Sequence, residues 1–163
     1  MIALKHILVA TDFGEASGAA LMYGRAFART CGASLHVLHV VDNRFMKPGA
    51  SDPHEIKSLK VNQLNACLSD NDRGILHACA IVETSNTPAQ AIVDYAKSAN
   101  IGLIVMGTHG RGAVAQLLVG SVAERVVRTA PCPVLTVRHP EREFGMPIPE
   151  RSASLSGERA ALG

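Results

Sequence analysis

The stretch that decides the fold covers residues 101–124 and reads IGLIVMGTHGRGAVAQLLVGSVAE. Its first part is an almost continuous apolar run with β-branched residues, which is typical of a strand buried on both faces of a sheet. Its last part, SVAE from Ser121, has the Ser-x-x-Glu spacing of a capping box, and apolar Val126 and Val127 follow. The stretch therefore predicts a strand, a polar glycine-containing turn and a helix.

Three glycines in this turn, Gly107, Gly110 and Gly120, precede Ser121 at fixed spacing. A glycine has no Cβ, so it can adopt a positive φ or let a ligand come close to the backbone. The first N–H groups of a helix and the positive end of its dipole bind phosphate oxygens well. The turn therefore predicts an anion site at the start of the helix, at Ser121 and Val122.

Strand-like and helix-like patterns alternate through the chain. The alternation predicts a doubly wound α/β fold, in which right-handed crossovers join the strands of one parallel sheet and helices cover both faces. We expect strands over residues 6–11, 34–41, 75–82, 103–107 and 134–138, and helices over 16–31, 53–68, 88–100 and from 121 to about 130.

Apolar residues at helical spacing predict which side of each helix faces the core. A second capping box, with a proline at the first helical position, predicts where the third helix begins. The expected core positions are Ala20, Tyr23 or Gly24, and Phe27 in the first helix, and Ile56, Leu59 or Lys60, Leu64 and Cys67 in the second; the second capping box is Thr87 with Gln90.

Polar groups are expected at one edge of the predicted sheet. Ligands of such sheets bind outside the carboxyl ends of the strands, where the strand order reverses. Asp12 closes the first strand and the glycine turn closes the fourth, so the two flank a single crevice if these strands are neighbours. The segment 43–52, with Pro48 and Gly49, is predicted to be a flexible loop over that crevice.

Composition excludes several classes of protein. The 16 basic and 14 acidic residues are interleaved, so no basic stripe indicates binding to nucleic acid. No apolar run reaches the roughly 18 residues of a membrane span. Four cysteines without a Cys-x-x-Cys pair and the lack of a signal peptide predict a cytoplasmic protein. We expect one domain over residues 1–140, followed by a disordered tail over 141–163 that is rich in Pro, Ser, Gly, Arg and Glu.

Other nucleotide and metal sites fit the sequence poorly. Gly110, Gly112 and Ala115 match a dinucleotide fingerprint, but the next predicted strand ends in Arg138 where that fold wants an acidic residue. The chain has no Gly-Lys dipeptide, which excludes a Walker phosphate loop. His36 and His39 lie three apart on one strand, so they face opposite sides and cannot share a metal.

The sequence resembles the universal stress protein family, specifically its ATP-binding branch. The pattern of that branch, Gly-x2-Gly-x9-Gly followed by Ser or Thr, is matched by the three glycines and Ser121. The segments HILVATDFGEAS, LHVLHVVD, LIVMGTHGRG and APCPVLTVR also resemble the first, second, fourth and fifth strands of the family, so the resemblance covers residues 5–138. It implies a Rossmann-like, adenine nucleotide α-hydrolase-like sheet of five strands in the order 3-2-1-4-5.

The resemblance also implies which residues border the base and the sugar. Asp12 would meet the ribose hydroxyls, and Ala10 and Thr11 would border the base and the sugar. Val40 would contact the adenine through its backbone, and Met106 would form a wall beside the sugar or base.

A second set of residues is implied for the phosphates. Gly107 and Gly110 would let the ribose and phosphates approach, and Gly120, Ser121 and Val122 would hold phosphate oxygens. His109 and Arg111 lie where they could reach the phosphates. No residue is identified as catalytic or as a metal ligand.

The function implied is an ATP-binding stress-response protein whose bound nucleotide changes its shape or its protein partners. ATP is the expected ligand, and Mg²⁺ could accompany it through the phosphates. A homodimer is expected through the fifth strand, because an edge strand offers unpaired N–H and C=O groups to a second copy. The alternatives are a slow Mg²⁺-dependent ATP hydrolase and a nucleotide-free dimeric scaffold of the same family.

Overall fold

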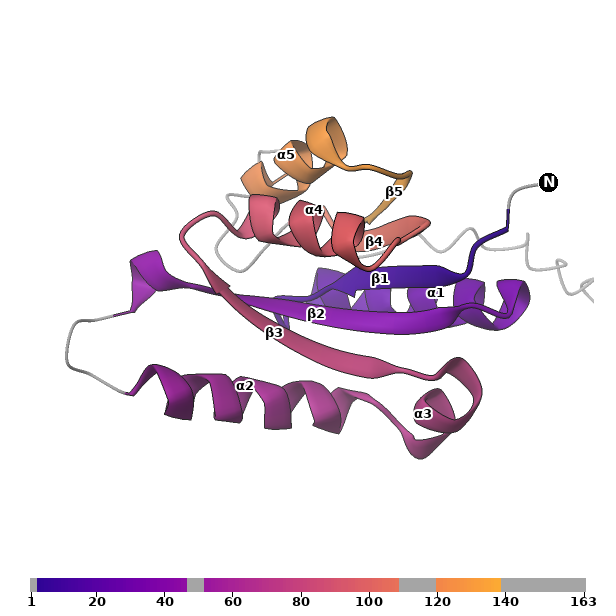
Figure 1. The fold of residues 1–163 in the computed structure, drawn as a ribbon, viewed down its shortest axis with the longest axis horizontal. Helices are drawn as coiled ribbons and strands as arrows, with labels where there is room; N and C mark the ends of the chain where they lie inside the picture. The colour runs from indigo at the N-terminus through magenta and orange to yellow at the C-terminus, as the bar shows by residue number, and fades with distance from the viewer. Residues whose placement is uncertain (1–2, 47–51, 109–119, 139–163) are drawn as a thin grey trace, which may run out of the picture.

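The computed structural model describes residues 3–46, 52–108 and 120–138. Strands and helices alternate along it, as the sequence predicts (Figure 1). In chain order the elements are β1 (His6–Ala10), α1 (Glu15–Cys31), β2 (Ser34–Asp42), the 3-10 helix η1 (Asn43–Phe45), α2 (Pro53–Cys67), α3 (Asp70–Leu76), β3 (Cys79–Ser85), α4 (Pro88–Ser98), β4 (Leu103–Gly107), α5 (Ser121–Thr129) and β5 (Val134–Val137).

The five strands form one parallel sheet in the order β3-β2-β1-β4-β5, which confirms the predicted fold class and strand order. Strand β1 is central, and its Ala10 is in register with Leu38 of β2 and with Met106 of β4. The chain moves outward from β1 to β3 and then returns to the other side of β1 with β4. The strand order therefore reverses between β1 and β4, which is where ligands bind in sheets of this kind.

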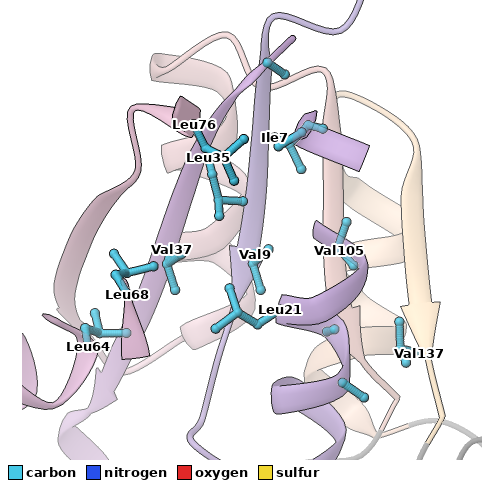
Figure 2. Close-up of a cluster of buried hydrophobic side chains, with 14 of the residues drawn as sticks. Ile7, Val9, Leu21, Leu35, Val37, Leu64, Leu68, Leu76, Val105 and Val137 are labelled. Carbon is cyan, nitrogen blue, oxygen red and sulfur yellow. The ribbon is translucent and has the colours of Figure 1, made fainter. Parts of the chain in front are cut away.

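Helices cover both faces of the sheet and produce two apolar clusters. One cluster lies under α1, α2 and α3, and Figure 2 shows Val9 of β1 beside Leu21 of α1, and Val37 of β2 beside Leu64 and Leu68. The other cluster lies under α4 and α5, which pack against each other. Burying each such valine or leucine completely contributes about 1.5–3 kcal/mol.

Helix α1 lies close to the sheet because all the buried residues of its inward face except Leu21 are small. A Cβ on Gly24 would collide with the Val9 side chain, and Ala28 is fully buried. Of the two predicted positions, Gly24 is therefore the inward one, whereas Tyr23 is 41% exposed and Phe27 is 37% exposed. The helical spacing of apolar residues correctly predicted helix α1, but the large side chains Tyr23 and Phe27 lie on its solvent side instead of in the core.

The predicted inward side of α2 is partly correct. Leu64 is fully buried and Ile56 packs against the first cluster, as expected. Leu59 is 61% exposed, so of the two alternatives it is the half-buried Lys60 that lies on the inward side. Cys67 was also expected on that side but is exposed. The helix covers the sheet edge with a narrower apolar stripe than the sequence indicates.

The predicted strand over residues 75–82 is wrong in its first half, because Leu76 ends α3 and β3 begins only at Cys79. Helix α3 begins with a capping box in which Ser69 and Asp72 exchange hydrogen bonds. The Asp72 carboxylate is 1% exposed and accepts hydrogen bonds from Arg25 of α1, with Nη2 to Oδ2 at 2.9 Å. Burial alone would raise the pKa of Asp72, but the hydrogen bonds from Arg25 and Ser69 outweigh it and hold the pKa below its usual value.

Two other local predictions need correction. Thr87 does precede α4 and Pro88 is at its first turn, but Thr87 makes no side-chain cap, so no capping box forms there. The predicted flexible loop over 43–52 begins with the 3-10 helix η1 and ends with Asp52, which caps α2 by accepting from the His54 N–H.

Some predictions fall on residues outside the described ranges. These include Pro48 and Gly49 of the loop, the positions 109–112 and 115 of the glycine turn, and the tail over 141–163. Among the residues that the structure does describe, no helix combines the length and the apolar character needed to cross a bilayer.

Candidate functional site

The carboxyl end of β1 is fixed to β2 by two hydrogen bonds. The Thr11 N–H donates to the Leu38 carbonyl at 2.9 Å, which extends the β1–β2 pairing by one residue. The Thr11 carbonyl accepts from Nδ1 of His39 at 2.8 Å, and because a carbonyl only accepts, this ring nitrogen carries the proton. Both backbone polar groups of Thr11 are thus held by consecutive residues of β2.

Asp12 closes the turn from β1 into α1. Its Oδ1 accepts from the Gly14 N–H at 2.9 Å and from the Ser17 hydroxyl at 2.8 Å. A Cβ on Gly14 would lie only 3.0 Å from this oxygen, so the turn favours glycine at that position. Half-buried Asp12 therefore uses one carboxylate oxygen to shape the turn in which it stands.

Phe13 adopts a conformation that bulky residues rarely take, with φ of 63°. A residue held there costs about 1–3 kcal/mol, and the surroundings must compensate for it. The Phe13 N–H donates to the Thr11 hydroxyl at 3.0 Å, and the ring lies 4.5 Å from the His39 ring, centroid to centroid. Lys60 of α2 places its Nζ 5.1 Å from the Phe13 centroid, a cation–π distance.

Three of the residues expected to border a base lie on one face of the sheet. Ala10 and Met106 are register partners, are 7% and 5% exposed, and belong to the cluster under α4 and α5. Val40 is half-buried and packs against the same cluster. The structure thus brings Ala10, Val40 and Met106 together on the α4 and α5 side of the edge.

Gly107 at the end of β4 has a packing role that the sequence analysis did not assign. A Cβ there would lie 2.8 Å from Ala16 Cβ and 3.0 Å from the Ala16 carbonyl carbon, in the first turn of α1. This close approach of α1 accounts for a glycine at 107 without a ligand. Access for a ribose or phosphate at Gly107 remains a prediction.

The start of α5 is attached to the end of β4. The Thr108 N–H donates to the Val137 carbonyl at 2.8 Å, and the Thr108 carbonyl accepts from the Gly120 N–H at 2.5 Å. These bonds bring Gly120, Ser121 and Val122 to the same edge as Asp12 and Met106. His109, Gly110 and Arg111 lie in the interval 109–119, outside the described residues.

The capping box predicted at Ser121 is wrong, because Gly120 is the N-cap and Ser121 is already helical. Gly120 has φ of −70° and ψ of 153°, and its carbonyl accepts the first helical bond from the Glu124 N–H. Glu124 pairs with Arg128 at 3.0 Å. Gly120 has no side-chain oxygen to accept from the first N–H groups of α5, and such a helix start is well suited to a phosphate.

The two histidines of β2 point to opposite faces, as predicted. Nδ1 of His36 lies 2.8 Å from the Tyr95 hydroxyl of α4, whereas His39 contacts the turn after β1. Burial lowers the pKa of His36, and the nearby His6 lowers it further. Within residues 3–46, 52–108 and 120–138, no three His, Cys, Asp or Glu side chains are grouped so as to hold a metal ion.

Several residues that shape this edge of the sheet are not among those predicted from the sequence. Thr108 acts through its backbone, which no side-chain pattern reveals, and the φ of Phe13 has no sequence signal. The Ser17 hydroxyl bonded to Asp12 could have been found, since it lies one turn into a helix that follows a polar strand end. His39 is buried, at 9% exposure, and its contacts with the turn after β1 have no signal in the sequence.

Comparisons with known proteins identify relatives over nearly the whole described chain. A model of the universal stress protein family matches residues 3–138. The chain is 32% identical over 149 residues to the universal stress protein MJ0531 of Methanocaldococcus jannaschii, covering 85% of each protein. Among solved structures, that of the hypothetical protein MJ0577 is 28% identical with a TM-score of 0.70, covering 86% of this chain and 100% of the other.

Two more distant structures contain an adenine nucleotide. A universal stress protein in complex with cAMP is 22% identical with a TM-score of 0.64, covering 83% of this chain and 98% of its own. A universal stress protein from Archaeoglobus fulgidus in complex with dAMP is also 22% identical, with a TM-score of 0.59 and coverage of 84% and 99%. At such identity the likeness establishes a shared fold, and the ligands belong to those two proteins.

Proposed function

We propose that this chain, which belongs to the universal stress protein family, binds ATP at the edge formed by the carboxyl ends of β1 and β4. The observation that carries the proposal is the hydrogen bond from the Gly120 N–H to the Thr108 carbonyl. It attaches a helix start with no side-chain cap to the place where the strand order reverses. A nucleotide needs both an apolar site for its base and an anion site for its phosphates, and in this proposal the edge supplies both.

We assign the base and the sugar to the β1 side of the edge. Ala10, Met106 and Val40 would border the base at the end of β1; Val40 is half-buried, while Ala10 and Met106 are 7% and 5% exposed. Thr11 would border the sugar. Asp12 would accept hydrogen bonds from the ribose hydroxyls in addition to its bonds within the turn.

We assign the phosphates to the start of α5. The N–H groups of Ser121 and Val122 would bind phosphate oxygens, and Gly120 leaves the approach to them open. Gly107 and Gly110 would line the way to them, and His109 and Arg111 would add positive charge. In this proposal Mg²⁺ would be held through the phosphates.

The distant relatives support adenine as the base. The structures with cAMP and with dAMP share this fold and carry an adenine ring, although their phosphates differ from those of ATP. They therefore support the assignment of the base more strongly than that of the triphosphate.

The physiological role proposed is that of a nucleotide-dependent regulator in the cytoplasm. A ligand shifts a conformational equilibrium only if it binds one state more tightly, so ATP and its products must prefer different forms of this protein or of its complexes. Strand β5 is at one edge of the sheet, and we propose that two copies pair through it. All four cysteines are free, in keeping with a reducing compartment.

Slow Mg²⁺-dependent hydrolysis of ATP is the second candidate activity. It requires a group that orients the attacking water. Glu124 is exposed and paired with Arg128, and Asp12 Oδ1 is occupied by the turn, so we assign neither carboxylate as a base.

The double variant Gly120→Val with Ser121→Ala tests the phosphate assignment. The φ and ψ of Gly120 are open to valine, so α5 should still form, while the added side chain obstructs its first N–H groups. We expect calorimetric ATP affinity to fall at least about 10-fold, equivalent to about 1.4 kcal/mol. The matched control is Val127→Ala, at a 52% exposed position of the same helix, which should bind like the parent. Unchanged affinity in the double variant would refute the assignment.

A further inference from the structure

We infer that His39 is a positioning residue for the proposed nucleotide site, because it contacts the residues on both sides of Asp12. The inference rests on the proposed function. It adds that His39, which would touch no ligand atom, makes the site selective for nucleotides that carry ribose hydroxyls.

The first contact fixes the residue before Asp12. His39 Nδ1 donates to the Thr11 carbonyl at 2.8 Å, and the His39 side chain is 9% exposed, so water competes little for this bond. Without the imidazole this carbonyl would lose its donor. The peptide that joins Thr11 to Asp12 would then be free to rotate, and the Asp12 carboxylate would rotate with it.

The second contact fixes the residue after Asp12. The Phe13 ring packs at 4.5 Å on the His39 ring, and Lys60 covers it at 5.1 Å. Phe13 is held at a φ of 63°, which is maintained only where the surroundings specify it. The ring of His39 is one of the groups that specify it, so its loss removes support from both sides of Asp12.

These contacts leave the Asp12 carboxylate a narrow range of directions. Its Oδ1 is bound to the Gly14 N–H and the Ser17 hydroxyl, and the main chain on either side is held through His39. A carboxylate fixed in this way before binding loses less entropy when it meets the ribose. The ribose hydroxyls therefore gain affinity from His39, whereas the base and the phosphates do not.

The test compares ATP with 2′,3′-dideoxy-ATP, which lacks both ribose hydroxyls, by calorimetry on the full chain. In His39→Leu we expect ATP affinity to fall about 10-fold while dideoxy-ATP affinity stays within about 2-fold, so that the preference for ATP is lost. His39→Asn, whose amide N–H can replace Nδ1–H, should recover part of the preference. The matched control is His36→Leu, which changes the other histidine of β2 on the opposite face and should retain the preference.

Each outcome separates the inference from the function on which it rests. If His39→Leu lowers the affinity of both nucleotides equally, or changes neither, His39 does not position Asp12 and the inference is wrong while nucleotide binding stands. If the parent binds neither nucleotide, the proposed function fails and the inference fails with it. Should His39→Leu not fold, Phe13→Gly removes the ring that packs on His39 but suits the positive φ, and an unchanged preference in that variant would show that the contact of His39 with Phe13 does not position Asp12.

Discussion

The Gly120 N–H and the Thr108 carbonyl form a 2.5 Å hydrogen bond that joins the first residue before α5 to the first residue after β4. The 11 residues between them are the interval 109–119. The bond therefore determines where the helix start lies, whatever path the chain takes between its two partners. Thr108 thus connects two elements, which we call the Thr108 junction: its carbonyl is bonded to Gly120 before α5, and its N–H is bonded to the carbonyl of Val137 in β5.

Gly120→Pro should break this junction while leaving the local backbone angles intact. Proline suits the φ of −70° but has no N–H, so the Thr108 carbonyl loses its donor in a residue that is 7% exposed. We expect a loss of stability of about 1–3 kcal/mol and at least about a 10-fold loss of ATP affinity. Gly120→Ala keeps the N–H and is the control. Equal stability of the two variants in urea unfolding would contradict the role of the bond.

Gly107→Ala should destabilise the fold through crowding against α1. The new methyl group would lie 2.8 Å from Ala16 Cβ and 3.0 Å from the Ala16 carbonyl carbon. Relieving this crowding requires the backbone of α1 to shift, which costs free energy. We expect a loss of about 1–3 kcal/mol in the free energy of unfolding. Gly18→Ala is a suitable comparison, because a Cβ there meets nothing within 4 Å, and it should gain about 0.5–1 kcal/mol. Destabilisation by both substitutions to a similar extent would argue against the packing account.

Asp72→Asn should reveal the contribution of the Arg25–Asp72 ion pair to stability. The pKa of Asp72 is lowered in the folded state, so its contribution is present above the unfolded pKa of about 3.9 and is lost as the pH falls through the folded value. At neutral pH we expect a loss of about 3 kcal/mol, because Arg25 is left beside a neutral amide.

The pH dependence provides the check on that prediction. The stability difference between the parent and Asp72→Asn should narrow in unfolding curves taken below pH 4, where the Asp72 carboxylate of the unfolded parent binds a proton and the folded carboxylate does so only at lower pH. A difference that stays constant from neutral to strongly acidic pH would show that shape, and not charge, is what Asp72 contributes.

Tyr95 should ionise only in strong base. Burial, together with the smaller effects of the neighbouring Cys79 and Glu83, raises its pKa to about 12. A folded pKa above the unfolded value of about 10 means that this group contributes stability below pH 10, which is lost as the pH rises toward 12. Ultraviolet titration should show this transition, and Tyr95→Phe should remove it. A tyrosine transition near 12 that persists in Tyr95→Phe would refute the assignment.

The fold could be predicted from sequence because its determinants are local and periodic. The buried run of β4 and the alternation of strands with helices predicted a parallel sheet, and the resemblance supplied the order that the structure confirms. The errors arose where local signals conflict. Ile75 and Leu76 read as strand residues, yet Ser69 and Asp72 cap a short helix that contains them.

The site could be predicted less completely, because much of it depends on backbone contacts between distant segments. The sequence indicated that Asp12 and the glycine turn share an edge, and register pairs Ala10 with Met106 there. It could not reveal that Gly107 meets α1, nor that Gly120 caps α5 in place of Ser121. Both depend on how closely two elements approach, which the spacing of residues does not encode.

The most direct test of the central claim is calorimetric titration with ATP and Mg²⁺ of protein that has been unfolded, stripped of small molecules and refolded. We predict saturable binding with a micromolar Kd and one nucleotide per chain, together with release of an adenine nucleotide when untreated protein is denatured. If the refolded protein has the native circular dichroism but shows no binding up to millimolar ATP, and no nucleotide is released from untreated protein, this edge is not an ATP site.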